Sequence, residues 1–149
     1  MIVYRLGKSK WANDLTGEGA RINGGRWNHI GIPCIYTSHT RALTVLEYSV
    51  HTPMEYIPGA LSFTLYNIPE NRIFVCTEYT LPVNWRNLAH SSECKDFGTD
   101  LLKKHLIIQL PSIVLPSEAN FILNPNHKDF HMITIENTED YSYDIRIKK

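Results

Sequence analysis

Short segments in which apolar and polar residues alternate dominate this chain and constrain its fold more than any other feature. Alternation with a period of two is typical of strands that bury one face. We expect strands at residues 2–6, 34–37, 61–68, 72–76, 112–115, 121–123, 130–136 and 141–147.

Two segments have a convincing helical pattern. The first covers about residues 39–51, with Ser38 as its N-cap and Pro53 just beyond its end. The second covers about residues 99–107, after a polar stretch that we interpret as a surface excursion. Strands and helices do not alternate regularly, which argues against a doubly wound parallel sheet. We expect one α+β domain over residues 1–149, built on short, mostly antiparallel strands.

The overall charge and hydropathy exclude several classes of partner. Fifteen basic and 15 acidic residues give a net charge of zero, so nothing draws the whole surface toward nucleic acid or anionic membranes. No apolar run reaches the ~20 residues that span a bilayer, and the N-terminus lacks the pattern of a signal peptide. We therefore expect a soluble, cytoplasmic protein that binds neither nucleic acid nor membranes directly.

Cysteine and histidine spacing does not predict a metal site. The three cysteines are far apart, and Cys34 lies in an apolar run that favours a buried thiol. His127 and His131 have the i, i+4 spacing of a zinc helix, but a strand-like segment follows them. We expect no metal ligand here.

A glycine-rich loop surrounds one arginine. Four of the eight glycines lie within residues 17–25, and Arg26 follows in the run Gly24-Gly25-Arg26-Trp27-Asn28. Glycine allows a ligand to approach the backbone, and arginine can hold a phosphate or carboxylate through two parallel hydrogen bonds. A glycine-rich turn with a solvated arginine is an equally good interpretation of this stretch alone.

Glu47 is a candidate catalytic carboxylate on the first predicted helix. Leu43, Leu46 and Val50 are spaced as one apolar stripe, and Glu47 lies at its edge. A carboxylate at that position is partly buried, which is a physical pointer to a functional site. By itself, a boundary glutamate whose stem packs and whose head reaches water is the more ordinary interpretation.

Two further candidates lie near the ends of predicted strands. Tyr36 precedes the first helix, and Ser117 follows the apolar segment that ends at Pro116. Taken alone, they are ordinary for a core tyrosine and a turn serine. A Gly-x-Ser-x-Gly elbow and a P-loop are absent, and Gly17-Glu18-Gly19 does not continue as a dinucleotide fingerprint.

The order of these motifs resembles the RES domain, the toxin half of RES/Xre toxin–antitoxin pairs. The matching segments are residues 19–28 with Gly31, 36–38, 42–47, 115–117 and 124–127. The resemblance implies an ADP-ribosyltransferase-like fold and a toxin that destroys NAD. NAD is then the substrate rather than a cofactor, and no cofactor is expected.

Carried over by position, the family's active-site residues are Arg26, Tyr36, Glu47 and Ser117, although Glu118 stands where a small residue is expected. In this scheme Arg26 clamps the pyrophosphate and Tyr36 stacks near the nicotinamide or its ribose. Glu47 binds ribose hydroxyls and stabilises the oxocarbenium charge, and Ser117 orients the nicotinamide side or the ribose. We expect Arg5 as a second anion contact and Trp27 as a packing residue that supports Arg26.

The predicted chemistry agrees with a single carboxylate. Nicotinamide leaves as a neutral group, so the second carboxyl group that protonates the leaving oxygen in ordinary glycosidases is not needed. The acceptor stays open between water, phosphate and a protein side chain, which correspond to hydrolysis, phosphorolysis and ADP-ribosylation of a target. A non-catalytic module that keeps the fold is a further alternative. A neutralising antitoxin with a helix-turn-helix, of the Xre type, is the implied partner.

Overall fold

The computed structural model describes residues 1–148 of the chain. Seven strands and three α-helices, joined by short 3-10 turns, make up the structure. In chain order they are β1 (Ile2–Lys8), α1 (Glu18–Asn23), β2 (Ile35–Ser38), α2 (Arg41–His51), β3 (Leu61–Asn67), β4 (Ile73–Val75), α3 (Ser92–Leu102), β5 (Ile107–Pro111), β6 (Ala119–Leu123) and β7 (Thr134–Tyr141).

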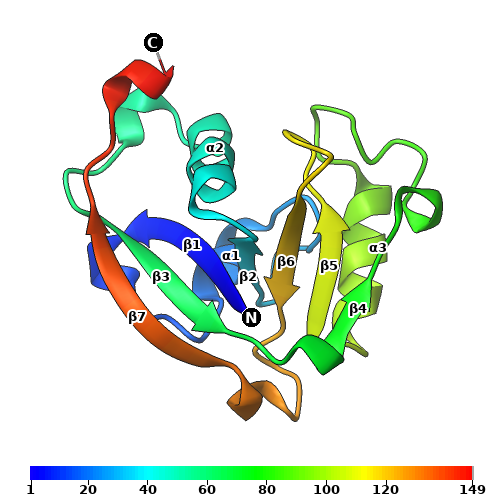
Figure 1. Ribbon diagram of the computed structural model, residues 1–149. Helices are drawn as coiled ribbons and strands as arrows, with labels where there is room; N and C mark the ends of the chain where they lie inside the picture. The colour runs from blue at the N-terminus through cyan, green and yellow to red at the C-terminus, as the bar shows by residue number, and fades with distance from the viewer. Residues whose placement is uncertain (149) are drawn as a thin grey trace.

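The strands form one sheet in the order β4-β5-β6-β2-β1-β3-β7. Only β4 and β5 run parallel, which confirms the predicted α+β class with mostly antiparallel strands. The register pairs β1 with β3 along the whole of β1, but it pairs β1 with β2 only at Tyr4 and Ser38. The two halves of the sheet therefore spread apart beyond this join (Figure 1).

Helix α2 lies over the join between the two halves (Figure 1). Its Val45 and Tyr48 pack against the β1 and β3 side chains of one apolar cluster. The predicted stripe was wrong for Leu46 and Val50, which are 37% and 57% exposed. Leu43 of that stripe is buried as predicted, and Val45 and Tyr48 complete the buried face because the helix lies above β1 and β2.

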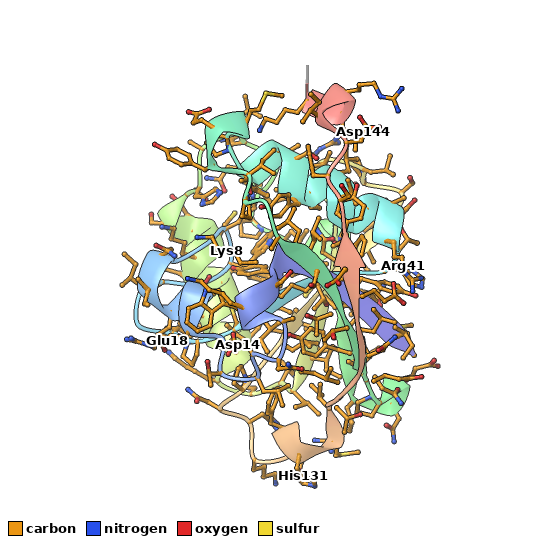
Figure 2. The ribbon with its side chains drawn as sticks, turned by 90° about the vertical axis from the view of Figure 1, so that its left-hand side faces the viewer. Lys8, Asp14, Glu18, Arg41, His131 and Asp144 are labelled. Carbon is orange, nitrogen blue, oxygen red and sulfur yellow. The ribbon has the colours of Figure 1, made fainter. Side chains whose placement is uncertain are left out.

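Both ends of α2 are tied to the C-terminal part of the chain. Arg41, labelled in Figure 2, forms a salt bridge with Glu139 of β7 at 2.7 Å. At the other end, the Lys148 ammonium donates to the carbonyl oxygens of Ser49 and Thr52. A cation at this end is favoured because the last carbonyls of a helix carry partial negative charge.

The start of α2 differs from the prediction by two residues. The N-cap is Thr40 rather than Ser38, since the Thr40 hydroxyl accepts the Leu43 N–H at 3.1 Å. Ser38 belongs to β2 and turns its hydroxyl to Asn120 instead.

Helix α3 occupies residues 92–102 instead of the predicted 99–107. It begins inside the polar stretch interpreted as a surface excursion, because Ser91 caps it by accepting the Cys94 N–H at 3.1 Å. Its buried Cys94 and Leu102 complete an apolar cluster with β5 and β6.

Two predicted strands were also wrong. Residues 112–115 form a turn closed by the Leu115 N–H on the Ser112 hydroxyl at 3.1 Å, and the strand β5 precedes them. At the C-terminal end, β7 stops at Tyr141 and residues 145–148 form a 3-10 helix. Because β5 replaces the first of these and no strand replaces the second, the described sheet has seven strands rather than the eight expected.

Gly98 lets α3 touch the backbone of the glycine-rich loop. A Cβ at this position would lie 2.0 Å from the carbonyl oxygen of Trp27. The Trp27 ring is 5% exposed and meets Phe97 edge-on at 6.1 Å, so it packs as expected. The position of the loop before β2 thus depends on a residue without a side chain in α3.

We predict that Gly98→Ala lowers the free energy of unfolding by about 3 kcal/mol, because helix and loop must separate to admit the methyl group. Urea denaturation measures this change. Gly59→Ala is the matched control, since no atom lies within 4 Å of a Cβ there and φ is ordinary. Equal stability of the two variants would contradict the proposed close contact.

Candidate active site

Glu47 is contacted from β6, from the turn after β5 and from its own helix. The Ser112 hydroxyl and the Asn120 Nδ2 both donate to its Oε1, at 2.7 and 2.6 Å. The other oxygen, Oε2, lies 3.3 Å from Nε2 of His51, one turn later on α2. The Glu47 side chain is 16% exposed, which confirms that the carboxylate is partly buried. We call these residues, with Ser38 behind Asn120, the Glu47 cluster.

The Glu47 cluster favours the ionised carboxylate. Burial raises the pKa of Glu47, but the hydrogen bonds from His51, Ser112 and Asn120 and the charge of protonated His51 together lower it below its ordinary value. Glu47 is therefore negatively charged at neutral pH.

Tyr36 lies on β2 with its hydroxyl enclosed by the glycine-rich loop. The hydroxyl donates to Oδ1 of Asn28 at 2.6 Å and accepts the Trp27 N–H at 3.1 Å. A Cβ on Gly25 would lie 2.7 Å from this oxygen, so only glycine fits there. Burial raises the pKa of Tyr36 well above its usual value, which keeps the phenol neutral.

Arg26 holds the loop that precedes α3. Its Nη1 donates to the carbonyl oxygens of Trp85 and Asn87 at 3.2 and 2.7 Å, and its Nη2 donates to that of Leu88 at 3.4 Å. Within residues 1–148, Nε of Arg26 donates no hydrogen bond and no carboxylate lies within salt-bridge distance of the group. One edge of the guanidinium, formed by Nε and the remaining Nη2 proton, is thus available to an anion.

Two histidines lie between Arg26 and Glu47. The rings of His51 and His90 meet at a centroid distance of 6.4 Å. Partial burial and the nearby cations Arg26, His51 and Lys95 lower the pKa of His90. The arrangement places the Arg26 guanidinium and two imidazole rings near the only carboxylate of the Glu47 cluster.

The structure does not bring Ser117 to the Glu47 cluster. Ser117 is exposed and lines a hollow of about 330 Å³ together with Gln109 and Ala119. Gln109 pairs with Phe121, and Ala119 is the neighbour of Asn120, so both point to the sheet face opposite Asn120.

Ser112 occupies the place in which we expected Ser117. The chain contains Leu-Pro-Ser twice, as Leu110-Pro111-Ser112 and Leu115-Pro116-Ser117, and only the first copy touches Glu47. This repeat was the signal in the sequence that could have identified Ser112. Asn120 carried no such signal.

Arg5 also lies away from the cluster. Its neighbour Tyr4 pairs with Ser38 and packs under α2, so alternation along β1 turns Arg5 to the other face. There its Nη1 donates to the carbonyl oxygen of Trp11 at 3.4 Å. The structure thus gives Arg5 a role in holding the segment after β1.

Cys34 and His131, which the sequence analysis also considered, are not part of the Glu47 cluster. Cys34 is 2% exposed, and burial raises its pKa to about 12, so it is the buried thiol expected. His131 lies at the end of the molecule opposite to α2 (Figure 2). Among residues 1–148, no three His, Cys, Asp or Glu side chains gather as a metal site requires, and no helix is long and apolar enough to cross a membrane.

The family model of the RES domain matches residues 2–145. A protein named Toxin Res from Photorhabdus laumondii is 36% identical over 100% of this chain and 98% of its own. The Prs ADP-ribosylating toxin of a Sphingobium species is 31% identical over 91% of this chain and 88% of its own.

A solved structure shares the fold. The crystal structure of the M. tuberculosis MbcT–MbcA toxin–antitoxin complex contains a chain that superposes with a TM-score of 0.75 over 95% of this chain and 84% of that one, at 16% identity. With the family model matched over nearly the whole length, the chain belongs to the RES domain family.

Proposed function

We propose that this chain is the toxin of a toxin–antitoxin pair and that it cleaves the bond between nicotinamide and ribose in NAD. The observation that carries this proposal is the state of Glu47. It is an ionised, partly buried carboxylate with one oxygen held by the protein and the other beside a half-exposed histidine. The names of the relatives support the toxin assignment.

The proposed reaction needs one carboxylate. The carbon–nitrogen bond breaks with its electron pair passing to the pyridinium nitrogen, so neutral nicotinamide leaves without a proton donor. An oxygen of water or phosphate then bonds to the anomeric carbon, and water releases its extra proton. Oε2 of Glu47 binds the ribose hydroxyls and stabilises the oxocarbenium charge, a type of interaction that often supplies the largest part of catalysis.

The other residues have supporting roles in this proposal. The open edge of Arg26 contacts the pyrophosphate while its remaining protons hold the loop of Trp85. Tyr36 presents its ring, since its hydroxyl is engaged by Trp27 and Asn28. Ser112 is buried and donates to Oε1 of Glu47, so it supports the carboxylate rather than touching the substrate as predicted for Ser117.

Transfer of ADP-ribose to a protein is the second candidate, which the name of the Sphingobium relative favours. Incubation with NAD labelled in the adenylate part and a cell extract separates the two. A labelled protein band indicates transfer, whereas small products alone indicate degradation. Measurable NAD affinity without any turnover would favour the non-catalytic module.

We propose NAD and an antitoxin as the two partners. Leu46 and Val50 leave an exposed apolar strip on α2 beside Glu47, which suits contact with a protein that covers the site. We predict that an adjacent reading frame encodes a small helix-turn-helix protein of the Xre type that co-purifies with this chain and blocks NAD loss. Absence of such a reading frame would count against the toxin assignment.

Glu47→Gln tests the catalytic role directly. The glutamine carbonyl oxygen can still accept from Ser112 and Asn120, so we expect the fold to persist. Loss of the negative charge should reduce the rate of nicotinamide release by roughly 10²–10³-fold. Release is followed chromatographically with purified protein and NAD, and an unchanged rate would exclude the proposed mechanism.

Ser112→Ala and Ser117→Ala form a matched pair. Loss of the Ser112 donor should cost about 1–2 kcal/mol of stability and raise the pKa of Glu47, since a hydrogen bond to the charged form is removed. A depressed pKa contributes stability above the unfolded value of about 4.3, which disappears as the pH falls through the folded pKa. We therefore expect the acid limb of NAD turnover and the acid unfolding midpoint to move to higher pH in Ser112→Ala.

The exposed Ser117 is expected to tolerate alanine without these shifts. The reverse pattern, with Ser117→Ala impaired and Ser112→Ala normal, would return the active-site role to Ser117.

A further inference from the structure

Asn120 is a donor of the Glu47 cluster whose strand is paired on both sides. It lies in β6 and pairs with Ser38 of β2 on one side and with Leu110 of β5 on the other. Its backbone is therefore fixed by two neighbouring strands in the middle of the sheet. The side chain rises from this position toward α2, where Glu47 meets it.

The direction of each hydrogen bond in the cluster follows from the charge on Glu47. An ionised carboxylate has no proton, so the atom of Asn120 that lies 2.6 Å from Oε1 must be the donor Nδ2. The amide oxygen Oδ1 then faces Ser38, whose hydroxyl donates to it at 2.7 Å. Ser38 thus fixes the orientation of the Asn120 amide.

The second donor on Oε1 is fixed in the same way. Ser112 accepts the Leu115 N–H at 3.1 Å and is 0% exposed, so its single proton is directed to Glu47. Oε1 is thereby occupied by two short hydrogen bonds, one from the turn after β5 and one from β6.

Oε2 has a different environment. Among the described residues its one partner is His51, whose side chain is 55% exposed. The two oxygens of one carboxylate are therefore unequal: Oε1 receives hydrogen bonds from β6 and from the turn after β5, whereas Oε2 lies beside an exposed imidazole.

We infer that Asn120, oriented by Ser38, is a positioning residue that fixes Glu47 so that Oε2 alone is presented to the substrate. That Oε2 meets a substrate rests on the proposed function. The effect of Asn120 on the carboxylate of Glu47 does not, and it can be measured without any turnover.

Asn120→Asp is the decisive variant. It keeps the size of the side chain but replaces the donor Nδ2 by an oxygen beside Oε1. Two carboxylates at this distance cannot both be ionised, so one proton is shared and one apparent pKa of the pair rises by about 2 units or more. The other groups that act on Glu47, His51 on α2 and the nearby Arg26, are unchanged.

The measurement is a pH titration of the glutamate side-chain carbonyl resonances by ¹³C NMR, with Glu47→Gln to assign the signal. We expect Glu47 to titrate at higher pH in Asn120→Asp and, by a smaller shift in the same direction, in Ser38→Ala. Asn137→Asp on the exposed strand β7 is the control with the same change of charge, and its Glu47 signal should titrate as in the wild type.

NAD turnover gives a second readout. In Asn120→Asp we expect kcat to fall at least tenfold with little change in KM, and to recover partly as the pH rises and the shared proton leaves. A Glu47 titration that matches the wild type in both Asn120→Asp and Ser38→Ala would overturn the inference even if NAD is cleaved. A shifted titration in a protein that does not cleave NAD would support the role of Asn120 and reject the proposed reaction instead.

Ser38→Ala is the second variant in case Asn120→Asp does not fold. It removes only one hydroxyl group at the end of β2 and keeps the Asn120 side chain. A thermal melt of each variant identifies any that does not fold, and the titration is then decided on Ser38→Ala alone.

Discussion

A carboxylate that leaves water must be met by hydrogen-bond donors, and at Glu47 this requirement connects α2 to the centre of the sheet. Ser112 and Asn120 supply the donors from either side of the turn between β5 and β6. If either donor is lost, a partly buried charge is left without compensation, which costs more than a surface hydrogen bond contributes. The same two hydrogen bonds therefore hold α2 over the sheet and keep Glu47 ionised.

The glycine-rich loop is held in place by two close backbone contacts. Gly25 lets the backbone close over the Tyr36 hydroxyl, and Gly98 lets α3 press on the carbonyl of Trp27. These two contacts fix the chain on both sides of Arg26, whose guanidinium then holds the loop from Trp85 to Leu88. Glycine is needed at these points for closeness rather than for an unusual φ, since neither Gly25 nor Gly98 has a positive φ.

The sequence predicted what depends on local pattern and missed what depends on contacts across the fold. Alternation placed β1 and β3 well, and periodicity placed α2. Glu47 is partly buried as predicted, although two of the three residues of the stripe from which this was inferred are exposed. The start of α3 was missed because its cap, Ser91, stands in a polar stretch and because Gly98 resembles a helix breaker until its contact with Trp27 is known. The face of α2 was misassigned in part: Leu43 is buried as predicted, but Val45 and Tyr48 pack against the sheet in place of Leu46 and Val50.

The two Leu-Pro-Ser copies show why site residues are hard to assign from spacing alone. Ser112 and Ser117 have the same preceding residues and lie five positions apart, so a motif read along the chain does not separate them. Strand alternation separates them. Asn120 lies on the sheet face that is turned toward Glu47, whereas Gln109 and Ala119, which line the hollow with Ser117, lie on the opposite face. A serine at this turn is a donor to the carboxylate only where β5 ends, since there its hydroxyl is buried and its acceptor side is already taken by Leu115. The register of β5 and β6, rather than the Leu-Pro-Ser motif, therefore decides which serine donates to Glu47.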